Sequence, residues 1–313
     1  MEAPLTHLEA IVFFSNQENC HNYLMSKRWP DGQVICPHCI SKNVGGFSRS
    51  RRIWNCKDCR KQFSIKVGTI FENSPLGLDK WLAAMWIIAN AKNGASSCEL
   101  ARTLGITQKS AWFMGHRIRL AFQQGSIDKL KGTVEADETF VGMKASNMHK
   151  SKRREKVKGT GPIAMIPIFG ALERGTEDRP SQVRLKVLNS RKRPDIHGGV
   201  SEFVEDGSKL YTDALRSYNG LNERYTHKTV DHAFCYVMGD VHTNGMENFW
   251  SLLKRTIKGT YICPSRRHLF RYLDEQAFRF NERTGNDSNR FDLAVSEVSG
   301  KRIRYRELIS KSA

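Results

Sequence analysis

The sequence lacks an apolar run long enough to cross a membrane. The longest such run, around residues 81–91, includes Asn90 and is far shorter than the roughly 20 residues that a spanning helix needs. The first residues, MEAPLTHLEA, also lack a basic stretch followed by an apolar core, so we expect no secretory signal. These absences argue against a membrane protein and favour a cytoplasmic location.

Acidic residues are also few relative to basic ones. The 313 residues include 50 Lys or Arg and 32 Asp or Glu, which gives a formal net charge of +18 and an isoelectric point near 9.7. This balance indicates a polyanionic partner. Nucleic acid is favoured over an acidic membrane, because no amphipathic anchor or lipidation motif is evident. With 39% hydrophobic residues the composition is that of a folded protein, and the length allows two or three domains.

Part of the positive charge is concentrated in one basic run, KASNMHKSKRREKVKG at residues 144–159, which has seven Lys or Arg and one Glu. Such a run is typical of a solvated loop. A solvated loop can also contact phosphate. We therefore predict that Lys152, Arg153 and Arg154 bind DNA.

The cysteines do not have the arrangement of a disulfide framework, which would also require export. Of the eight, four form two CxxC pairs separated by 16 residues: Cys36 with Cys39, and Cys56 with Cys59. A redox CxxC would be a single pair on a thioredoxin-like unit. The observed spacing fits a zinc site of four thiolates, because each CxxC turn presents two sulfurs to one ion.

The residues between the two pairs predict a small zinc ribbon over 33–67. GGFSRSRRIWNC favours a hairpin that turns at Gly45–Gly46, with a core too small to fold without the metal. Four thiolates leave no open coordination position, so this zinc would be structural. The ribbon would display Arg49, Arg51 and Arg52 as a basic rim for DNA phosphates.

Helices are predicted on both sides of the ribbon, at 1–32 and at 68–125. SSCELARTLGITQKSAWFMGHRIRLAF has a helix–turn–helix pattern, with a serine cap, a turn at Gly105 and a second cap at Thr107. The first residues of such a second helix reach base edges in DNA-binding proteins. A three-helix core without DNA contact would give the same apolar pattern. The polar residues predicted on the exposed face, of which the first three would bind DNA, are Gln108, Lys109, Ser110, His116, Arg117 and Arg119.

From about residue 130 the pattern changes to strands. GTVEADETFVG, GPIAMIPIFGALER and QVRLKVLNS predict a three-stranded meander, followed by a helix near 193–204. SKLYTDAL and HKTVDH predict two further strands, with a helix between them, and TNGMENFWSLLKRTIKG predicts a final helix. This order indicates an α/β domain over 130–283, which a basic C-terminal tail would follow at 284–313.

Three acids stand out in this domain: Asp137 on the first strand, Asp213 at the end of a later strand and Glu247 on the final helix. The order of elements can bring them to one rim. Carboxylates held close raise one another's pKa unless a cation neutralises them, and hard oxygen ligands suit Mg²⁺ or Mn²⁺. Two such ions can activate an attacking hydroxyl and stabilise the leaving oxygen of a phosphodiester. The alternative is that these are ordinary surface or capping acids.

Other residues near these acids have more than one interpretation. Helical geometry places Lys254 and Lys258 on the same exposed edge as Glu247, where we expect them to bind DNA phosphates. Trp250 could stack on a base or pack in the core. Glu138 would point to the opposite face of the first strand. Rival acids in the same domain are Asp206, Asp231 and Asp240.

Several long stretches between residues 8 and 283 resemble bacterial insertion-sequence transposases that carry a zinc ribbon before a D,D,E catalytic domain, the group related to Merlin-type DNA transposases. The stretches that carry the resemblance are RWPDGQVICPHC, CKDCRKQFSIKVGTIFENSPL, LARTLGITQKSAWFMGHRIR, VEADETFVG, YTDALRSY and HTNGMENFWSLLKR with YLDEQAFRFN. Two departures from the family pattern, Phe140 in place of Tyr and Met143 in place of Gly, follow the first acid without replacing it.

The resemblance implies an RNase H-like α/β core, a mixed sheet flanked by helices, preceded by a zinc ribbon and a helix–turn–helix domain. Asp137, Asp213 and Glu247 would be the catalytic acids and would bind magnesium or manganese. The family binds terminal inverted repeats in double-stranded DNA, cleaves there and joins the ends to target DNA. We expect a homodimer or higher oligomer on DNA at the bacterial nucleoid. Two alternatives stay open: an RNase H-like nuclease that does not join, and a zinc-ribbon DNA-binding regulator with an inactive catalytic domain.

Overall fold

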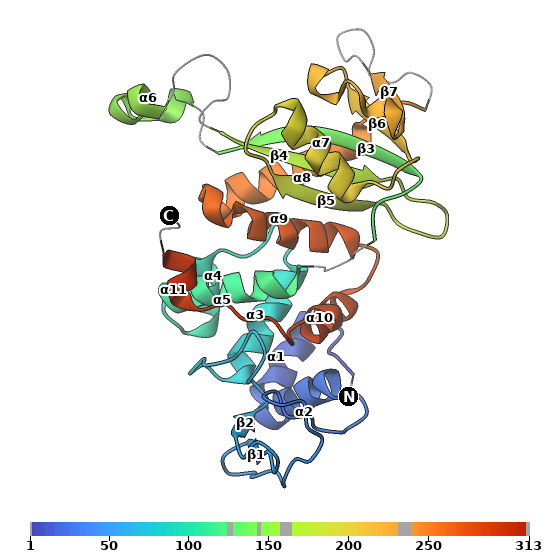
Figure 1. Ribbon diagram of the computed structural model, residues 1–313. Helices are drawn as coiled ribbons and strands as arrows, with labels where there is room; N and C mark the ends of the chain where they lie inside the picture. The colour runs from blue at the N-terminus through green and yellow to red at the C-terminus, as the bar shows by residue number, and fades with distance from the viewer. Residues whose placement is uncertain (1, 124–127, 143–144, 157–164, 231–239, 311–313) are drawn as a thin grey trace. The chain divides into compact units, whose positions relative to one another are not determined.

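The computed structural model describes residues 2–123, 128–142, 145–156, 165–230 and 240–310. The chain forms two compact units (Figure 1). The first consists of Met1–Gln123 with Gly285–Ala313, and the second of Gln124–Thr284. Within the described ranges, no helix combines the length and apolar character that a membrane span requires.

The central helix of the first unit is α3 (Leu78–Asn90), whose mostly apolar sequence is buried along nearly its whole length. The helices that pack around it include α1 (His7–Ser15), α2 (Gln17–Arg28) and α10 (Asp287–Ser296). Aromatic rings fill the space between them: Phe14 lies 6.4 Å from Trp86 and 5.3 Å from Phe291, between ring centroids. The burial of these large rings stabilises the unit more than any local propensity does.

The C-terminal segment, expected as a basic tail, contributes to this core. It contains α10 and the short α11 (Tyr305–Ile309). Phe291, Ala294 and Val295 recur at helical spacing and are fully buried. Phe291 also stacks on Tyr23 of α2, with 5.5 Å between ring centroids. The apolar stripe therefore outweighs the positive charge in deciding where this segment lies.

The ribbon contains two short antiparallel strands, β1 (Ile53–Asn55) and β2 (Gln62–Ser64). A hairpin is present, as predicted: β1 forms its second arm, and a bridge between Ser48 and Ile53 closes it. Its turn lies at residues 49–52 rather than at Gly45–Gly46, because the N–H of Gly45 already donates to the carbonyl of Asn55 at 2.7 Å. The ribbon arginines therefore occupy the tip of the hairpin.

Two helices joined by a tight turn follow α3: α4 (Ser97–Leu104) and α5 (Gln108–Ala121). Ser96 caps the first helix, and Thr107 caps the second. Gly105 between them adopts the left-handed conformation, with φ of 60°, which favours glycine. The predicted caps and turn are all present.

The far end of α5 is more buried than predicted. His116, Arg117 and Arg119, expected on the exposed face, are 0%, 3% and 4% exposed, so that expectation was wrong. The Arg117 guanidinium lies 5.1 Å from the Trp81 ring centroid and donates to the carbonyl of Glu72 at 2.6 Å. The helix packs on α3 and also against the C-terminal segment, and local periodicity cannot reveal either contact.

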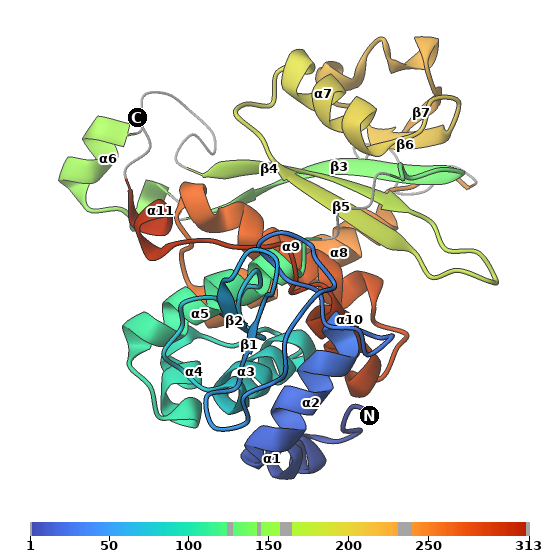
Figure 2. The same cartoon turned by 60° about the horizontal axis from the view of Figure 1, so that its bottom comes forward.

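A five-stranded mixed sheet forms the centre of the second unit, in the order β5-β4-β3-β6-β7 (Figure 2). The strands are β3 (Thr133–Val141), β4 (Ile166–Glu173), β5 (Gln182–Val187), β6 (Lys209–Asp213) and β7 (Thr226–Val230). The first three form the predicted antiparallel meander, and β6 and β7 are added in parallel to β3. The predicted α/β class, a mixed sheet flanked by helices as in an RNase H-like core, is confirmed.

Helices cover both faces of this sheet. They are α7 (Arg193–Phe203) on one face, and α8 (Asn244–Thr256) and α9 (Arg266–Asn281) on the other. Side chains alternate along a strand, so Ala136 of β3 joins the core beneath α7 while its neighbours Glu135 and Asp137 face α8.

Two segments of the second unit differ from the predicted secondary structure. The basic run contains a 3₁₀ turn, η1 (Ala145–Asn147), and α6 (Lys150–Lys156), because Lys, Arg and Glu are good helix formers. Arg153 and Arg154 are exposed, whereas the side chain of Lys152 lies outside the described residues. The helix expected between β6 and β7 is instead a pair of 3₁₀ turns, η2 (Arg216–Tyr218) and η3 (Leu221–Glu223).

Candidate active site and metal centre

The three predicted catalytic acids lie on three elements of the second unit. Asp137 is in β3, Asp213 is the last residue of β6, and Glu247 is in the first turn of α8. β3 and β6 are neighbours in the sheet, and α8 packs against β3 and β4. The charges of Asp213 and Glu247 both act on the Asp137 carboxyl, so the fold brings the three acids within electrostatic range.

Two donors hold the Asp137 carboxylate. Nε1 of Trp250 in α8 donates to Oδ2 at 2.9 Å, and the backbone N–H of Glu138 donates to Oδ1 at 2.8 Å. Burial raises the pKa of Asp137 to about 6, and the negative charges of Asp213 and Glu247 act in the same direction. The two hydrogen bonds oppose this rise. A carboxylate in such surroundings is well suited to neutralisation by a cation.

Gly170 of β4 has no side chain and so leaves room for the Trp250 ring to lie over the sheet. It is the register partner of Asp137. A Cβ added at this glycine would lie 2.4 Å from Cε of Met246 and 2.6 Å from Cη2 of Trp250. Trp250 is 4% exposed and directs its N–H to Asp137, which favours the core-packing interpretation over base stacking.

Glu138 is a further carboxyl group beside these acids, although it follows Asp137 on the alternate face of β3. Burial raises the pKa of Glu138 to about 7, and the charges of Asp213 and Asp137 add to the rise. The Tyr218 hydroxyl and the charge of Arg191 act the other way. A group that titrates near neutral pH therefore adjoins the predicted site. Two adjacent acids in a strand were the sequence signal for it.

The rival acids have other surroundings. Asp206 forms a surface ion pair with Arg224, whose Nη2 lies 2.7 Å from Oδ1. Asp240 is exposed, and Asp231 lies outside the described residues.

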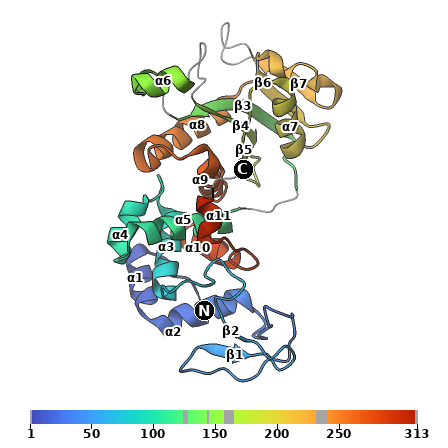
Figure 3. The same cartoon turned by 60° about the vertical axis from the view of Figure 1, so that its left-hand side comes forward.

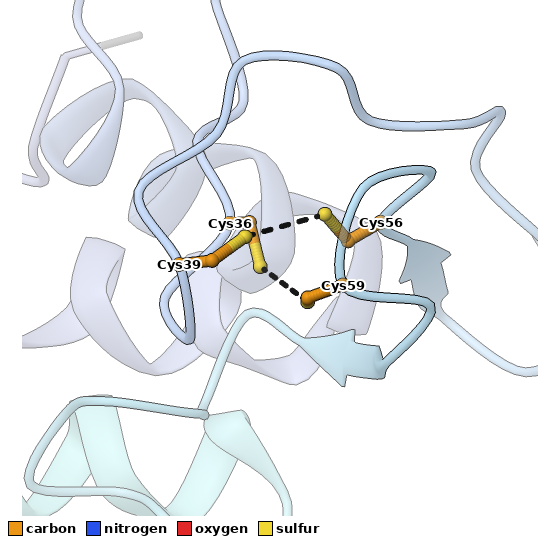
Figure 4. Close-up of side chains that lie close together, drawn as sticks. All are labelled: Cys36, Cys39, Cys56 and Cys59. Carbon is orange, nitrogen blue, oxygen red and sulfur yellow. Dashed lines mark hydrogen bonds between the residues drawn. The ribbon is translucent and has the colours of Figure 1, made fainter.

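The four cysteines of the CxxC pairs converge in the ribbon (Figure 4). Their Sγ atoms all lie within 4.8 Å of one another, with 3.7 Å between Cys36 and Cys59 and 3.6 Å between Cys39 and Cys56. Four thiolates about 2.3 Å from one tetrahedral zinc ion would be about 3.8 Å apart. A disulfide would require about 2.05 Å. The group therefore has the dimensions of a structural zinc site, and among the described residues no other His, Cys, Asp and Glu side chains gather three or more at this distance.

Backbone groups around the second CxxC pair favour the thiolate that zinc requires. The N–H of Cys59, with a smaller contribution from Asp58, lowers the pKa of the Cys56 thiol to about 7. Burial and the neighbouring cysteines instead raise the pKa of Cys39 to about 12, so the first proton leaves from Cys56. The Asp58 carboxylate also accepts a 2.7 Å hydrogen bond from Nδ2 of Asn43, so it connects the two halves of the ribbon. A thiol with a lowered pKa loses its proton readily and binds metal as the thiolate.

The zinc ribbon lies beside α2 within the first unit (Figure 3), and aromatic stacking connects the two. The Trp54 ring is stacked on His21 of α2 at 5.7 Å and on Phe63 at 5.8 Å, between centroids. Nη1 of Arg52 donates to Oε1 of Gln17 at 3.1 Å. These contacts hold the tip of the ribbon hairpin against α2.

The comparison with protein families agrees with this architecture. Residues 129–281 match the model of the ISXO2-like transposase domain, and residues 15–62 match that of the transposase zinc-ribbon domain. The chain belongs to the insertion-sequence transposases with an N-terminal zinc ribbon. This transposase is 29% identical over 256 residues to an uncharacterized protein in transposable element ISH50 of Halobacterium salinarum, a match that spans 78% of this chain and 84% of that protein.

In the first unit of the transposase, the residues predicted to contact DNA lie at the hairpin tip and at the start of α5. The exposed tip residues are Arg49, Arg51 and Arg52. Nε2 of Gln108 donates to Oγ of Ser97 at 2.8 Å, and Nζ of Lys109 lies 4.9 Å from the Tyr305 ring centroid. Ser110 is half-buried, and its N–H donates to the cap residue Thr107.

In the second unit, the predicted lysines follow Glu247 along α8. Lys254 is exposed in the last turn of the helix. Lys258 is exposed in the π-helical turn Ile257–Tyr261, which continues directly from α8. A continuous helical surface therefore carries the acid and both lysines.

Proposed function

We propose that this chain is a D,D,E transposase that binds the terminal inverted repeats of its element, cleaves the DNA there and transfers the ends to target DNA. The observation that supports this most is the effect of Asp213 and Glu247 on the Asp137 carboxyl within a transposase domain. Acids on three different elements, two of which act electrostatically on the third, are expected of a metal-dependent site for phosphodiester chemistry.

The donor set suits Mg²⁺ or Mn²⁺. Carboxylate oxygens are the ligands these ions prefer. The negative charges of Asp213 and Glu247 disfavour an ionised Asp137, and a divalent cation held by these three residues would relieve this effect. When bound, a pair of such ions activates the attacking hydroxyl and stabilises the leaving oxygen. The four-cysteine zinc, which has no open position, takes no part in this chemistry.

The reaction would proceed in two substitutions at phosphorus. Water attacks the phosphodiester at the element boundary, the bond to the 3′ oxygen breaks, and a 3′-hydroxyl is released. That hydroxyl then attacks a target phosphodiester, so that one P–O bond forms as another breaks. Asp137 would keep a fixed orientation in both steps, because Trp250 and the N–H of Glu138 each bond one of its oxygens.

Binding to double-stranded DNA would use exposed cations of both units. The hairpin tip and the helix–turn–helix formed by α4 and α5 would hold the inverted repeats, and the basic run with the lysines of α8 would meet phosphates near the cut. Positive charge at these points supports such a role, given the net charge of +18. Pairing of two element ends would call for a homodimer or higher oligomer on the DNA.

The experiment is a cleavage and joining assay with duplexes that end in the element's inverted repeats, a target plasmid and Mg²⁺ or Mn²⁺. The wild-type chain should cut at the boundary and yield joined product. Asp137→Asn should lose both, because one metal ligand is removed. Asp206→Asn is the matched control, since this acid is exposed and paired with Arg224, and it should keep both activities. Cutting without joined product would support a nuclease, and DNA binding without cutting would support a regulator.

A further inference from the structure

An ion pair with a buried carboxylate lies beside Asp137 in β3. Glu135 is two residues before Asp137 on the same face of β3, and its side chain is 1% exposed. Nε of Arg174, the residue directly after β4, donates to Oε1 of Glu135 at 2.7 Å. A buried charge with one partner would be unfavourable, so the remaining contacts of both groups decide what the pair does.

Arg174 uses its other donors on the segment that leads into α8. Nη1 donates to the carbonyl of Asp240 at 2.8 Å. Nη2 donates to the carbonyl of His242 at 2.9 Å and to its Nδ1 at 2.8 Å. The guanidinium also lies 5.0 Å from the ring centroid of Tyr211, which is the register partner of Glu135 in β6. One side chain therefore contacts β3, β6 and the approach to α8.

Glu135 holds the start of α8 directly. Its Oε2 accepts the backbone N–H of Met246, in the first turn of the helix, at 3.0 Å. Gly245 permits this approach, because a Cβ at that position would lie 2.8 Å from Oε2. A carboxylate at this end of a helix satisfies an otherwise unbonded donor and is favoured by the helix dipole.

We propose that Glu135 and Arg174 are positioning residues that set the spacing of Asp137, Asp213 and Glu247. This inference rests on the proposed function of those three acids as the metal-binding set. Each acid lies one or two residues along the chain from a contact of the pair: Asp137 after Glu135, Asp213 after Tyr211 and Glu247 after Met246. A displacement at the pair would therefore be passed to all three carboxylates.

Stability alone does not account for the arrangement. Replacing a buried ion pair by apolar residues is often neutral or stabilising. Arg174 instead makes four hydrogen bonds in different directions, to Glu135, to Asp240 and twice to His242. A planar group with fixed donor geometry specifies where its partners lie relative to one another.

The variants Arg174→Lys and Glu135→Gln test this proposal. Lysine keeps the charge beside Glu135 but cannot reach the two carbonyls and Nδ1 at once. Glutamine keeps the size of Glu135 but replaces one of its two acceptor oxygens with an NH₂ donor. It therefore loses the hydrogen bond either with Arg174 or with the N–H of Met246. The control is Arg224→Lys, because Arg224 also pairs with an acid and lies over a tyrosine ring, but it is exposed and lies directly before β7.

The measurements are made on zinc-loaded protein. Binding of Mn²⁺ alone, without DNA, is followed by the electron paramagnetic resonance signal of the free ion. Cleavage rate is then measured against Mn²⁺ concentration, together with the Kd for inverted-repeat duplex and the Tm. We expect Arg174→Lys and Glu135→Gln to weaken Mn²⁺ binding and to slow cleavage by about 10–100-fold, with duplex Kd unchanged. Arg224→Lys should match the wild type.

If one of the two variants does not fold, the other alone is sufficient to test the prediction. Unchanged Mn²⁺ affinity and cleavage in a folded variant would overturn the positioning role. A loss that scaled with Tm in all three variants, including Arg224→Lys, would also overturn it. Failure of the proposed function has a different signature: the wild type would itself show no Mn²⁺-dependent cleavage, or Asp137→Asn would leave it intact.

Discussion

The indole Nε1 of Trp250 donates to Oδ2 of Asp137 at 2.9 Å, and this bond joins α8 to the strand that carries the first acid. A hydrogen bond to an ionised carboxylate favours the charged form. Trp250 therefore opposes the burial that raises the pKa of Asp137 to about 6. The Trp250 side chain therefore orients the Asp137 carboxyl group and also favours its ionised form.

Trp250→Phe should shift the pH dependence of cleavage upward. The carboxylate must be ionised to bind metal, so activity is lost as pH falls through the pKa of Asp137. Without the indole donor that pKa rises, by about one pH unit if the bond contributes about 1.5 kcal/mol. The measurement is cleavage rate from acid to neutral pH. Phe249→Leu, a buried neighbour without a bond to an acid, should leave the midpoint in place.

Asp137→Asn should stabilise the chain at neutral pH when no divalent cation is added. The folded state raises the pKa of Asp137 from 3.8 to about 6, so between these values it holds a proton that the unfolded state has released. The free energy of unfolding of the wild type therefore falls as pH rises through this window. We expect the variant to be more stable by on the order of 2 kcal/mol near pH 7.5 and equally stable near pH 4, by urea unfolding. Added Mn²⁺ should stabilise only the wild type.

Gly170→Ala should disturb the contact between α8 and the sheet. The added methyl group would meet Met246 and Trp250 at less than contact distance. Overpacking of this kind costs about 1–3 kcal/mol, and cleavage should fall with it as the Asp137 bond is displaced. Gly198→Ala in α7 is the control, since nothing lies within 4 Å of its added Cβ. It should be neutral or stabilising, by up to about 1 kcal/mol, in thermal unfolding.

Cys36→Ser should remove zinc from the ribbon. Metal analysis of the purified chain should give about one zinc per wild-type chain and much less in the variant, because three thiolates and a serine hydroxyl hold zinc poorly. Cys98→Ser, at an exposed cysteine outside the ribbon, should keep its zinc. Equal zinc content in all three proteins would show that the four-cysteine assignment is wrong.

Replacing Arg49, Arg51 and Arg52 with glutamine should weaken duplex binding and flatten its dependence on salt. Each lost phosphate contact lowers the slope of log K against log salt by about 0.9, so the triple variant should lose up to about 3. Mn²⁺ binding at the acids should stay the same. The control removes equal charge from exposed Lys131, Arg179 and Arg224, and its slope should follow the wild type.

Local patterns predicted much of the secondary structure. The caps at Ser96 and Thr107 and the turn at Gly105 lie where the sequence placed them, because capping depends on residues three or four positions apart. The strands of the meander were visible for a similar reason. Local patterns wrongly predicted that His116 and Arg117 are exposed, because their burial depends on packing against α3 and the C-terminal segment.

The sequence by itself determined the zinc site, since its ligands form two CxxC turns and their spacing fixes the metal. It also determined which three acids to consider, through a resemblance carried by the stretches around them. Only the tertiary structure decided what surrounds those acids. Arg174 lies 39 residues from Glu135 and 68 from His242 along the chain. No periodicity relates residues so far apart. Their contact exists only because β3 lies between β4 and β6 in the sheet and because α8 packs on β3 and β4.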